Sequence, residues 1–79
     1  MKLPRDIHGR ELAAALCRHW GYREIHQAGS HIILQTDTPE YHRISVPAHK
    51  PLRIGTLNAI LRSVAAAKHC MREAILASL

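Results

Sequence analysis

Aromatic residues, acidic residues and long apolar runs are scarce in this chain of 79 residues. Phe is absent, aromatic residues make up 4%, and six Asp or Glu residues stand against eleven Lys or Arg, for a formal net charge of +5. No apolar run approaches the roughly 20 residues that a membrane-spanning helix needs. The length excludes two-domain enzymes and predicts one small domain over residues 1–79 with a thin core.

Cysteine and clustered metal ligands are also lacking. The two cysteines, Cys17 and Cys70, form no C-x-x-C motif, which predicts reduced thiols in a cytoplasmic protein. No two of the seven histidines are closer than five positions, so local metal-binding patterns such as H-x-H and H-E-x-x-H are absent and no metal is expected. The G-x-G-x-x-G, P-loop and G-x-S-x-G patterns are absent as well, which argues against a nucleotide cofactor and a serine hydrolase.

The excess of positive charge favours a polyanionic partner, either nucleic acid or an acidic protein. The plain alternative is a solvated basic surface that keeps the protein soluble. Charge alone does not decide between the two.

Two segments have the apolar spacing of amphipathic helices. The first begins after His8, with Glu11 as its capping-box partner, and ends at Gly21. The second follows the i, i+3, i+4, i+7 pattern over Leu57–Ala65. Helical spacing resumes over Met71–Leu79, either as a continuation of the second helix or as a separate one.

Between these helices, residues 31–36 and 42–46 predict a β-hairpin, and residues 22–27 predict a further short strand. A five-residue loop between the last two strands places Leu34 opposite Ile44 and gathers the aliphatic side chains on one face. The opposite face then carries His31, Ile33, Gln35, Arg43 and Ser45.

The turn that leads into His31 is the one arrangement that could carry chemistry. Histidine exchanges protons near physiological pH, and RNA supplies its own nucleophile in the 2′-OH, so this residue could promote cleavage as general base or general acid. Gly29 would let a phosphate approach the backbone. Lys50, Arg53 and the helix start at Gly55–Thr56 could hold phosphates. The plain alternative is that His31 is an ordinary surface histidine and that Lys50 and Arg53 are solvated charges.

Several short motifs lie in a characteristic order within residues 8–65. They are Gly21-Tyr22, Gly29-Ser30-His31, Ile44-Ser45-Val46-Pro47-Ala48-His49-Lys50, Gly55-Thr56-Leu57 and Ile60-Leu61. Together they resemble the HicA toxin family. The resemblance implies an α+β fold like that of a double-stranded-RNA-binding domain, in the order α-β-β-β-α, with a three-stranded antiparallel sheet and helices on one face. It also implies an mRNA interferase, the toxin of a type II toxin–antitoxin system, with His31 as its catalytic residue.

By the same resemblance, a HicB-like antitoxin binds the toxin and covers the site, mRNA is the substrate, and no cofactor is needed. We expect a cytoplasmic protein without a membrane association and a monomeric free toxin. The expected RNA-binding residues are Gly29, Ser30, Lys50 and Arg53, with His49 as a candidate helper of His31.

Two other interpretations stay open at this point. The chain could be a non-enzymatic RNA-binding or regulatory module of the same fold, or an inactive remnant that still binds an antitoxin. The glycine that commonly follows the second helix in the family is missing from Val64–Lys68, which leaves the course of the C-terminal helix open.

Overall fold

The computed structural model describes residues 6–49 and 51–79, which form three helices and three strands. In chain order these are α1 (Gly9–His19), β1 (Arg23–Ala28), β2 (His31–Thr36), β3 (His42–Pro47), α2 (Ile54–Ala67) and α3 (Arg72–Ala77). The order confirms the predicted α+β class and the arrangement of a double-stranded-RNA-binding domain, with α3 added at the end.

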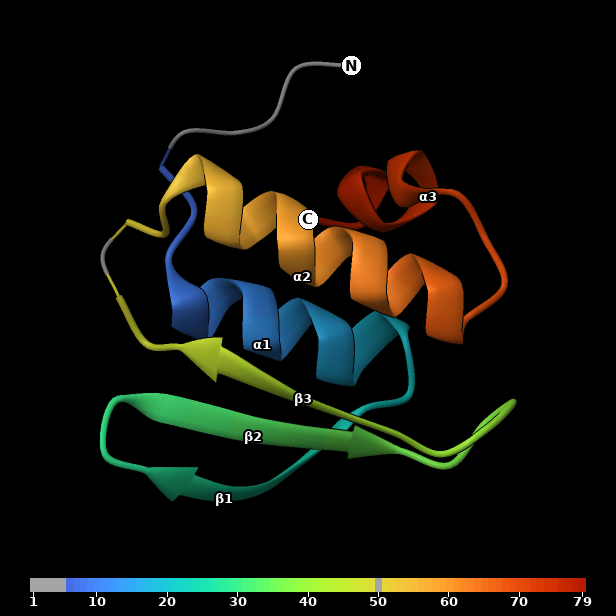
Figure 1. The fold of residues 1–79 in the computed structure, drawn as a ribbon, viewed down its shortest axis with the longest axis horizontal. Helices are drawn as coiled ribbons and strands as arrows, with labels where there is room; N and C mark the ends of the chain where they lie inside the picture. The colour runs from blue at the N-terminus through green and yellow to red at the C-terminus, as the bar shows by residue number, and fades with distance from the viewer. Residues whose placement is uncertain (1–5, 50) are drawn as a thin grey trace.

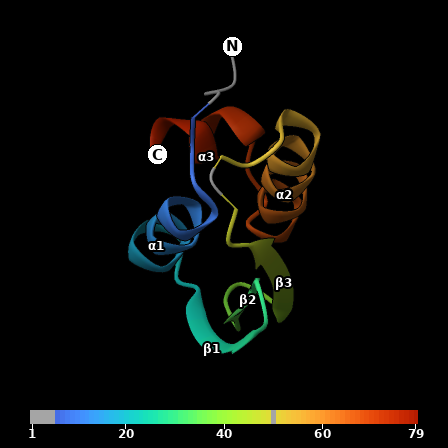
Figure 2. The ribbon, with the colours of Figure 1, turned by 90° about the vertical axis from the view of Figure 1, so that its left-hand side faces the viewer.

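The helices lie on one side of a single antiparallel sheet, whose strand order is β1-β2-β3 (Figure 1). α1 contacts all three strands, α2 contacts β3, and α3 packs against α2 on the side away from the sheet (Figure 2). None of the elements in the described part of the chain covers the opposite face of the sheet, which we call the open face. The open face is therefore the side on which a strand residue can meet another molecule.

The pairing of β2 with β3 confirms the predicted register. Ile32 pairs with Val46 and Leu34 with Ile44, as the five-residue loop requires. The side chains of Ile32, Leu34 and Val46 are buried beneath the helices, and Ile44 packs at the margin of the core. Because side chains alternate along a strand, the residues between them lie on the open face.

α1 begins and ends where the sequence predicts. The backbone N–H of His8 donates to the carboxylate of Glu11 at 3.1 Å, which is the capping-box contact. After the C-cap residue Trp20, Gly21 adopts a φ of 73°, a conformation that glycine takes at little cost. Gly21 therefore ends the helix and turns the chain toward β1.

Gly9 allows the start of α1 to lie directly against the end of β3. Its N–H donates to the carbonyl of His49 at 3.0 Å, and a Cβ at this position would lie 1.7 Å from the carbonyl oxygen of Pro47. No side chain fits between two backbones at that distance. The contact ties α1 to the segment that follows β3.

α2 and α3 are separate helices. α2 follows Arg53 as its N-cap and begins at Ile54, slightly before the predicted start at Gly55–Thr56. Beyond its C-terminus His69 adopts a φ of 55°, and α3 begins at Arg72. His69 ends α2 and redirects the chain through its left-handed conformation, the role that a glycine after a helix commonly has and that Val64–Lys68 lacks a glycine to fill.

The core lies between the sheet and the helices and contains the predicted stripe of α2. The buried residues of that stripe are Leu57, Ile60, Leu61, Val64 and Ala65. Both cysteines are free and half-buried. Within the described residues, no helix is both long and apolar enough to cross a membrane.

Candidate functional site

His31 is the first residue of β2, and its side chain is exposed on the open face. The turn before it contains Gly29 with a φ of 61°, which a residue with a side chain would adopt only under strain. Across the sheet His31 pairs with Pro47, the last residue of β3. The imidazole therefore stands at one end of the β2–β3 ribbon with solvent in front of it.

Ser45 provides the hydrogen-bond partner of His31. The Oγ of Ser45 lies 3.2 Å from Nδ1 of the imidazole, from the neighbouring strand and on the same face. Within the described residues no other group hydrogen-bonds to this ring, so Nε2 is open to an incoming molecule. Sequence reasoning placed Ser45 on the correct face but assigned it no role, because the diagonal contact depends on side-chain conformation rather than on register.

The turn that carries His31 is held from both sides. The backbone N–H of Ala48 donates to the carbonyl of Ser30 at 2.7 Å, and the side-chain amide of Gln27 donates to the carbonyl of Gly29 at 3.1 Å. Arg10 of α1 in turn donates to Oε1 of Gln27 at 3.0 Å. These contacts fix the backbone immediately before the imidazole.

A hollow lies beside this site on the open face. Its lining residues are Ile25, His26, Ile33, Arg43, Ile44 and Ser45. The predicted register placed Ile33, Arg43 and Ser45 on this face. Sequence reasoning assigned no register to residues 22–27 and therefore did not place Ile25 and His26, whose strand pairs with β2 with an irregularity between Glu24 and His26.

The predicted phosphate-binding residues are only partly brought together. Gly29 and Ser30 adjoin His31 in the turn, whereas Arg53 lies exposed at the start of α2. Lys50 lies outside the described residues. In the described part of the chain no hydrogen bond joins Arg53 or the ring of His49 to His31, so the structure supplies no contact for the candidate helper.

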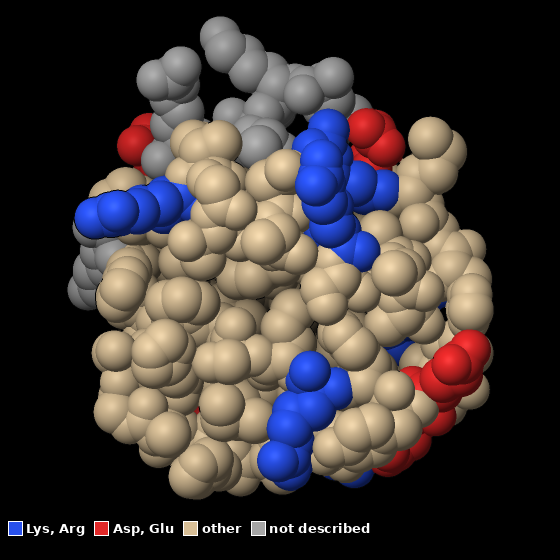
Figure 3. All heavy atoms as spheres, viewed as in Figure 1, with Lys and Arg blue, Asp and Glu red and all other residues tan. Residues whose placement is uncertain are grey.

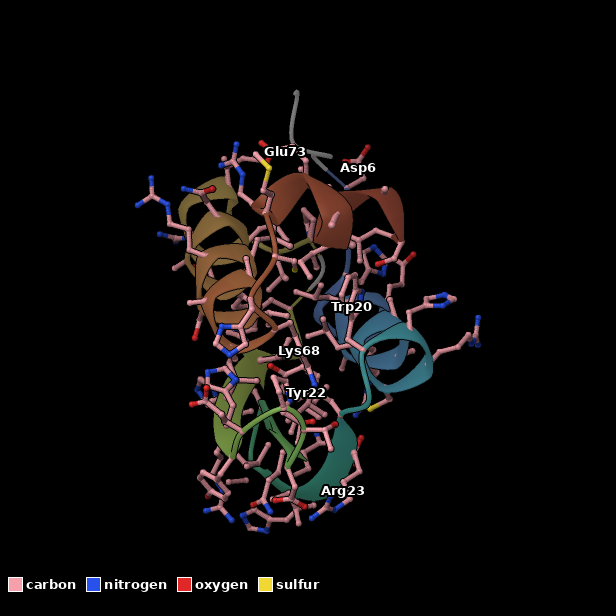
Figure 4. All side chains as sticks on the ribbon, turned by 90° about the vertical axis from the view of Figure 1, so that its right-hand side faces the viewer. Asp6, Trp20, Tyr22, Arg23, Lys68 and Glu73 are labelled. Atoms are coloured by element: carbon pink, nitrogen blue, oxygen red, sulfur yellow. The ribbon has the colours of Figure 1, made fainter. Side chains whose placement is uncertain are left out.

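A second polar cluster occupies the other end of the β2–β3 ribbon. The hydroxyl of Tyr22 and Nδ1 of His42 lie 2.8 Å apart, and Nε2 of His42 lies 3.0 Å from the Oγ of Ser63 on α2. Lys68 donates to the hydroxyl of Thr36 at 2.9 Å, and its ammonium stands 4.9 Å from the centre of the Tyr22 ring (Figure 4). Tyr22 and Thr36 are buried and the other members half-buried.

The environment of this cluster shifts its proton equilibria. Burial, and secondarily the neighbouring Cys70 thiol group, raises the pKa of Tyr22 to about 12. Burial, and secondarily the positive charge of Lys68, lowers the pKa of His42. Burial also lowers the pKa of Lys68. All three shifts favour the neutral form of the group, as expected where water is partly excluded.

On one face of the molecule the positive side chains are separated rather than gathered in one strip (Figure 3). On the face shown in Figure 3 the Lys and Arg side chains form separate groups divided by uncharged surface. Arg23 lies on the far side of the sheet from the helices, where it pairs with Asp37 at 2.9 Å (Figure 4). Arg43 on the open face donates to the neutral side chain of Gln35 at 3.3 Å and so keeps its charge uncompensated.

Among residues 6–49 and 51–79, no three potential metal ligands come together.

Comparison with known proteins yields one match. The model of a family described as the HicA toxin of bacterial toxin–antitoxin systems matches residues 9–65, which is more than half of the chain. The matched region runs from the start of α1 to the C-terminal part of α2 and includes the turn, His31 and Ser45. No curated protein and no solved structure matches the chain.

Proposed function

The chain belongs to the HicA toxin family, the toxins of bacterial toxin–antitoxin systems that pair with HicB-type antitoxins, and from this premise we propose that it is an endoribonuclease that cleaves mRNA. The catalytic residue in this proposal is His31. Cleavage of mRNA would stop translation and growth. The observation that carries the proposal is an exposed imidazole on an open sheet face, hydrogen-bonded at one nitrogen and open at the other.

A single imidazole is enough for this reaction because RNA brings its own nucleophile. When Nδ1–H of His31 donates to the Oγ of Ser45, the lone pair of Nε2 points outward and can accept the proton of the 2′-OH. The 2′-oxygen then attacks phosphorus and the bond to the 5′-oxygen breaks. The imidazolium form carries a proton on Nε2 that can pass to that leaving oxygen. Ser45 acts in this scheme as a positioning residue, since it orients the ring without touching the substrate.

The turn at His31 and the antitoxin contact share the open face of the sheet in this proposal. Gly29 and Ser30 offer a close backbone approach to a phosphate beside His31, and the positive charges of Lys50 and Arg53 are proposed as further phosphate contacts. The antitoxin restrains the toxin by covering the open face, where the half-buried Ile33 supplies an apolar contact. The free toxin acts as a monomer on mRNA in the cytoplasm and needs no metal ion.

Induced expression in a bacterial host tests the proposal, with cellular mRNA ends mapped by primer extension. Wild type should arrest growth and generate new mRNA ends, while His31→Ala should do neither and still accumulate as a folded protein. His19→Ala is the matched control, because His19 is an exposed histidine at the end of α1, away from the open face. Arrest without new mRNA ends would instead support an RNA-binding module, and full toxicity of His31→Ala would refute the assigned role.

A further inference from the structure

The hollow beside His31 is not used by the proposed proton transfer. Ser45 links the two, because it lines the hollow and also hydrogen-bonds to Nδ1 of the imidazole at 3.2 Å. Ile33 follows two positions after His31 on the same face of β2, and His26 pairs with Ile33 across the sheet. The hollow therefore begins within one side chain of the ring that would act on a phosphate.

The hollow lies beside an irregularity in β1. In a regular strand Ile25 and His26 would point to opposite faces. The pairing with β2 shifts between Glu24, which pairs with Leu34, and His26, which pairs with Ile33, and both Ile25 and His26 line the hollow. Ile25 is 41% exposed. Such irregularities commonly re-aim side chains next to functional sites.

The lining has the chemistry that recognises a nucleobase. Ile25 and Ile33 offer flat apolar surface, and the ring of His26 offers an aromatic face on which a base can stack. Arg43 and Ser45 offer donors to acceptor atoms at the edge of a base, and the nearest partner of Arg43 is the uncharged Gln35. No acidic residue lines the hollow to repel RNA.

We propose that this hollow is a base-binding subsite that receives the nucleobase flanking the cleaved phosphate and thereby sets the sequence preference of cleavage. The inference rests on the proposed ribonuclease function for the identity of the neighbouring phosphate. In RNA a base is separated from its phosphate by one ribose. A base held over Ile33 therefore places the adjoining phosphate in front of His31.

Cleavage of short single-stranded oligonucleotides tests the subsite, with matched substrates that carry or lack the base next to the cleaved bond. For wild type, removal of the base should reduce kcat/KM by roughly 5- to 100-fold, the effect of losing one stacked base. In Ile33→Ala, His26→Ala and Arg43→Gln the intact substrate should lose a similar factor, while the abasic substrate should be cleaved about as well as by wild type. Ile54→Ala is the control, because Ile54 on α2 is an exposed isoleucine, 43% exposed against 41% for Ile25, but lies off the open face.

Equal cleavage of the intact and abasic substrates by wild type would overturn the inference. It would also be overturned if the variants kept the wild-type base preference and lost only binding to the antitoxin, since the hollow would then belong to that partner. Binding of the same oligonucleotides to His31→Ala, followed by fluorescence anisotropy, separates this question from catalysis. If wild type cleaves no RNA, the proposed function fails, and the difference in binding between intact and abasic RNA still decides whether the hollow receives a base.

Discussion

The two ends of the β2–β3 ribbon each carry a histidine, and their surroundings differ. His31 is exposed on the open face, with one hydrogen bond to Ser45 at 3.2 Å. His42 is half-buried beside α2, with both ring nitrogens engaged, by Tyr22 at 2.8 Å and by Ser63 at 3.0 Å. One ring has a nitrogen available to another molecule, whereas the other joins parts of the protein to each other.

The difference is between polar groups that join elements of the fold and a polar group that faces solvent. The cluster around His42 connects β3 to α2 through Ser63 and to the segment between α1 and β1 through Tyr22. Three parts of the chain therefore share its hydrogen bonds. Removing one partner there leaves polar atoms without partners in a place that water reaches poorly, which is costly. His31 stands where its loss leaves solvated atoms, and the fold does not depend on it.

Replacing the histidine at each end of the ribbon by alanine should have opposite effects on cleavage and on stability. His31→Ala should reduce RNA cleavage by about 10²–10⁴-fold, because it removes the group proposed to transfer the proton. The same change should leave the free energy of unfolding within about 0.5 kcal/mol of wild type. His42→Ala should lower the free energy of unfolding by about 1–3 kcal/mol, since Tyr22 and Ser63 lose their partner. Urea unfolding of each variant, together with cleavage assays on the folded fraction, measures both effects.

The assignment of His42 to stability would be wrong if His42→Ala abolished cleavage while its free energy of unfolding stayed unchanged. In that case the buried histidine would belong to the chemistry. A matching loss of stability in His31→Ala would show instead that the exposed ring supports the fold. Tyr22→Phe serves as a control for the loss of one hydrogen bond at the buried end, because it removes the hydroxyl that bonds to His42 and retains the tyrosine ring.

The fold was predictable where one local rule settled the structure. Period-two alternation with a five-residue loop fixed the register of β2 and β3, and Gly21 fixed the end of α1. The break between α2 and α3 was not predictable in this way. It occurs at His69, which has a positive φ, a conformation uncommon in residues other than glycine. Nε2 of this histidine contacts the carboxylate of Glu40 at 3.0 Å, 29 positions earlier in the chain.

The candidate site was predictable in its position more than in its contacts. The face of His31 followed from the register, and the family match extends over that region. The hydrogen bond between Ser45 and His31 depends on side-chain conformations, and the lining of the hollow by both Ile25 and His26 accompanies an irregular strand pairing, neither of which a pattern in the sequence encodes. The role of Gly9 was not predictable either, because it depends on a contact with Pro47, which lies 38 positions away in the chain.

Substitution of Gly9 tests how much the close contact between α1 and the end of β3 contributes to stability. Gly9→Ala should lower the free energy of unfolding by about 1–3 kcal/mol or more, because its Cβ would collide with the carbonyl of Pro47. Gly55→Ala is the matched control within α2, where a Cβ meets nothing within 4 Å. That change should raise stability by up to about 1 kcal/mol through helix propensity. Thermal unfolding of both variants decides, and a neutral Gly9→Ala would mean that α1 can shift on β3 without cost.

The smallest expected effect is a pH dependence of stability that originates at the buried end. Burial, and secondarily the nearby charge of Lys68, lowers the pKa of His42 in the folded protein below the ordinary histidine value of about 6.5 that applies to an unfolded chain. As the pH falls below 6.5, the unfolded chain therefore binds a proton first, and the free energy of unfolding decreases until the folded-state pKa is passed. The groups that face the ring are the neutral hydroxyls of Tyr22 and Ser63 and the ammonium of Lys68, none of which compensates a charged imidazole.

Urea unfolding between about pH 7.5 and pH 5 measures this contribution. The decrease in stability on acidification should be smaller in His42→Asn than in wild type, because the asparagine does not titrate. His31→Asn is the control from the exposed end and should retain the wild-type decrease, because its side chain is exposed and, among the described residues, hydrogen-bonds only to Ser45. If both variants reduced the acid sensitivity equally, the two ends of the ribbon would be alike in their protonation and the contrast between them would rest on hydrogen bonding alone.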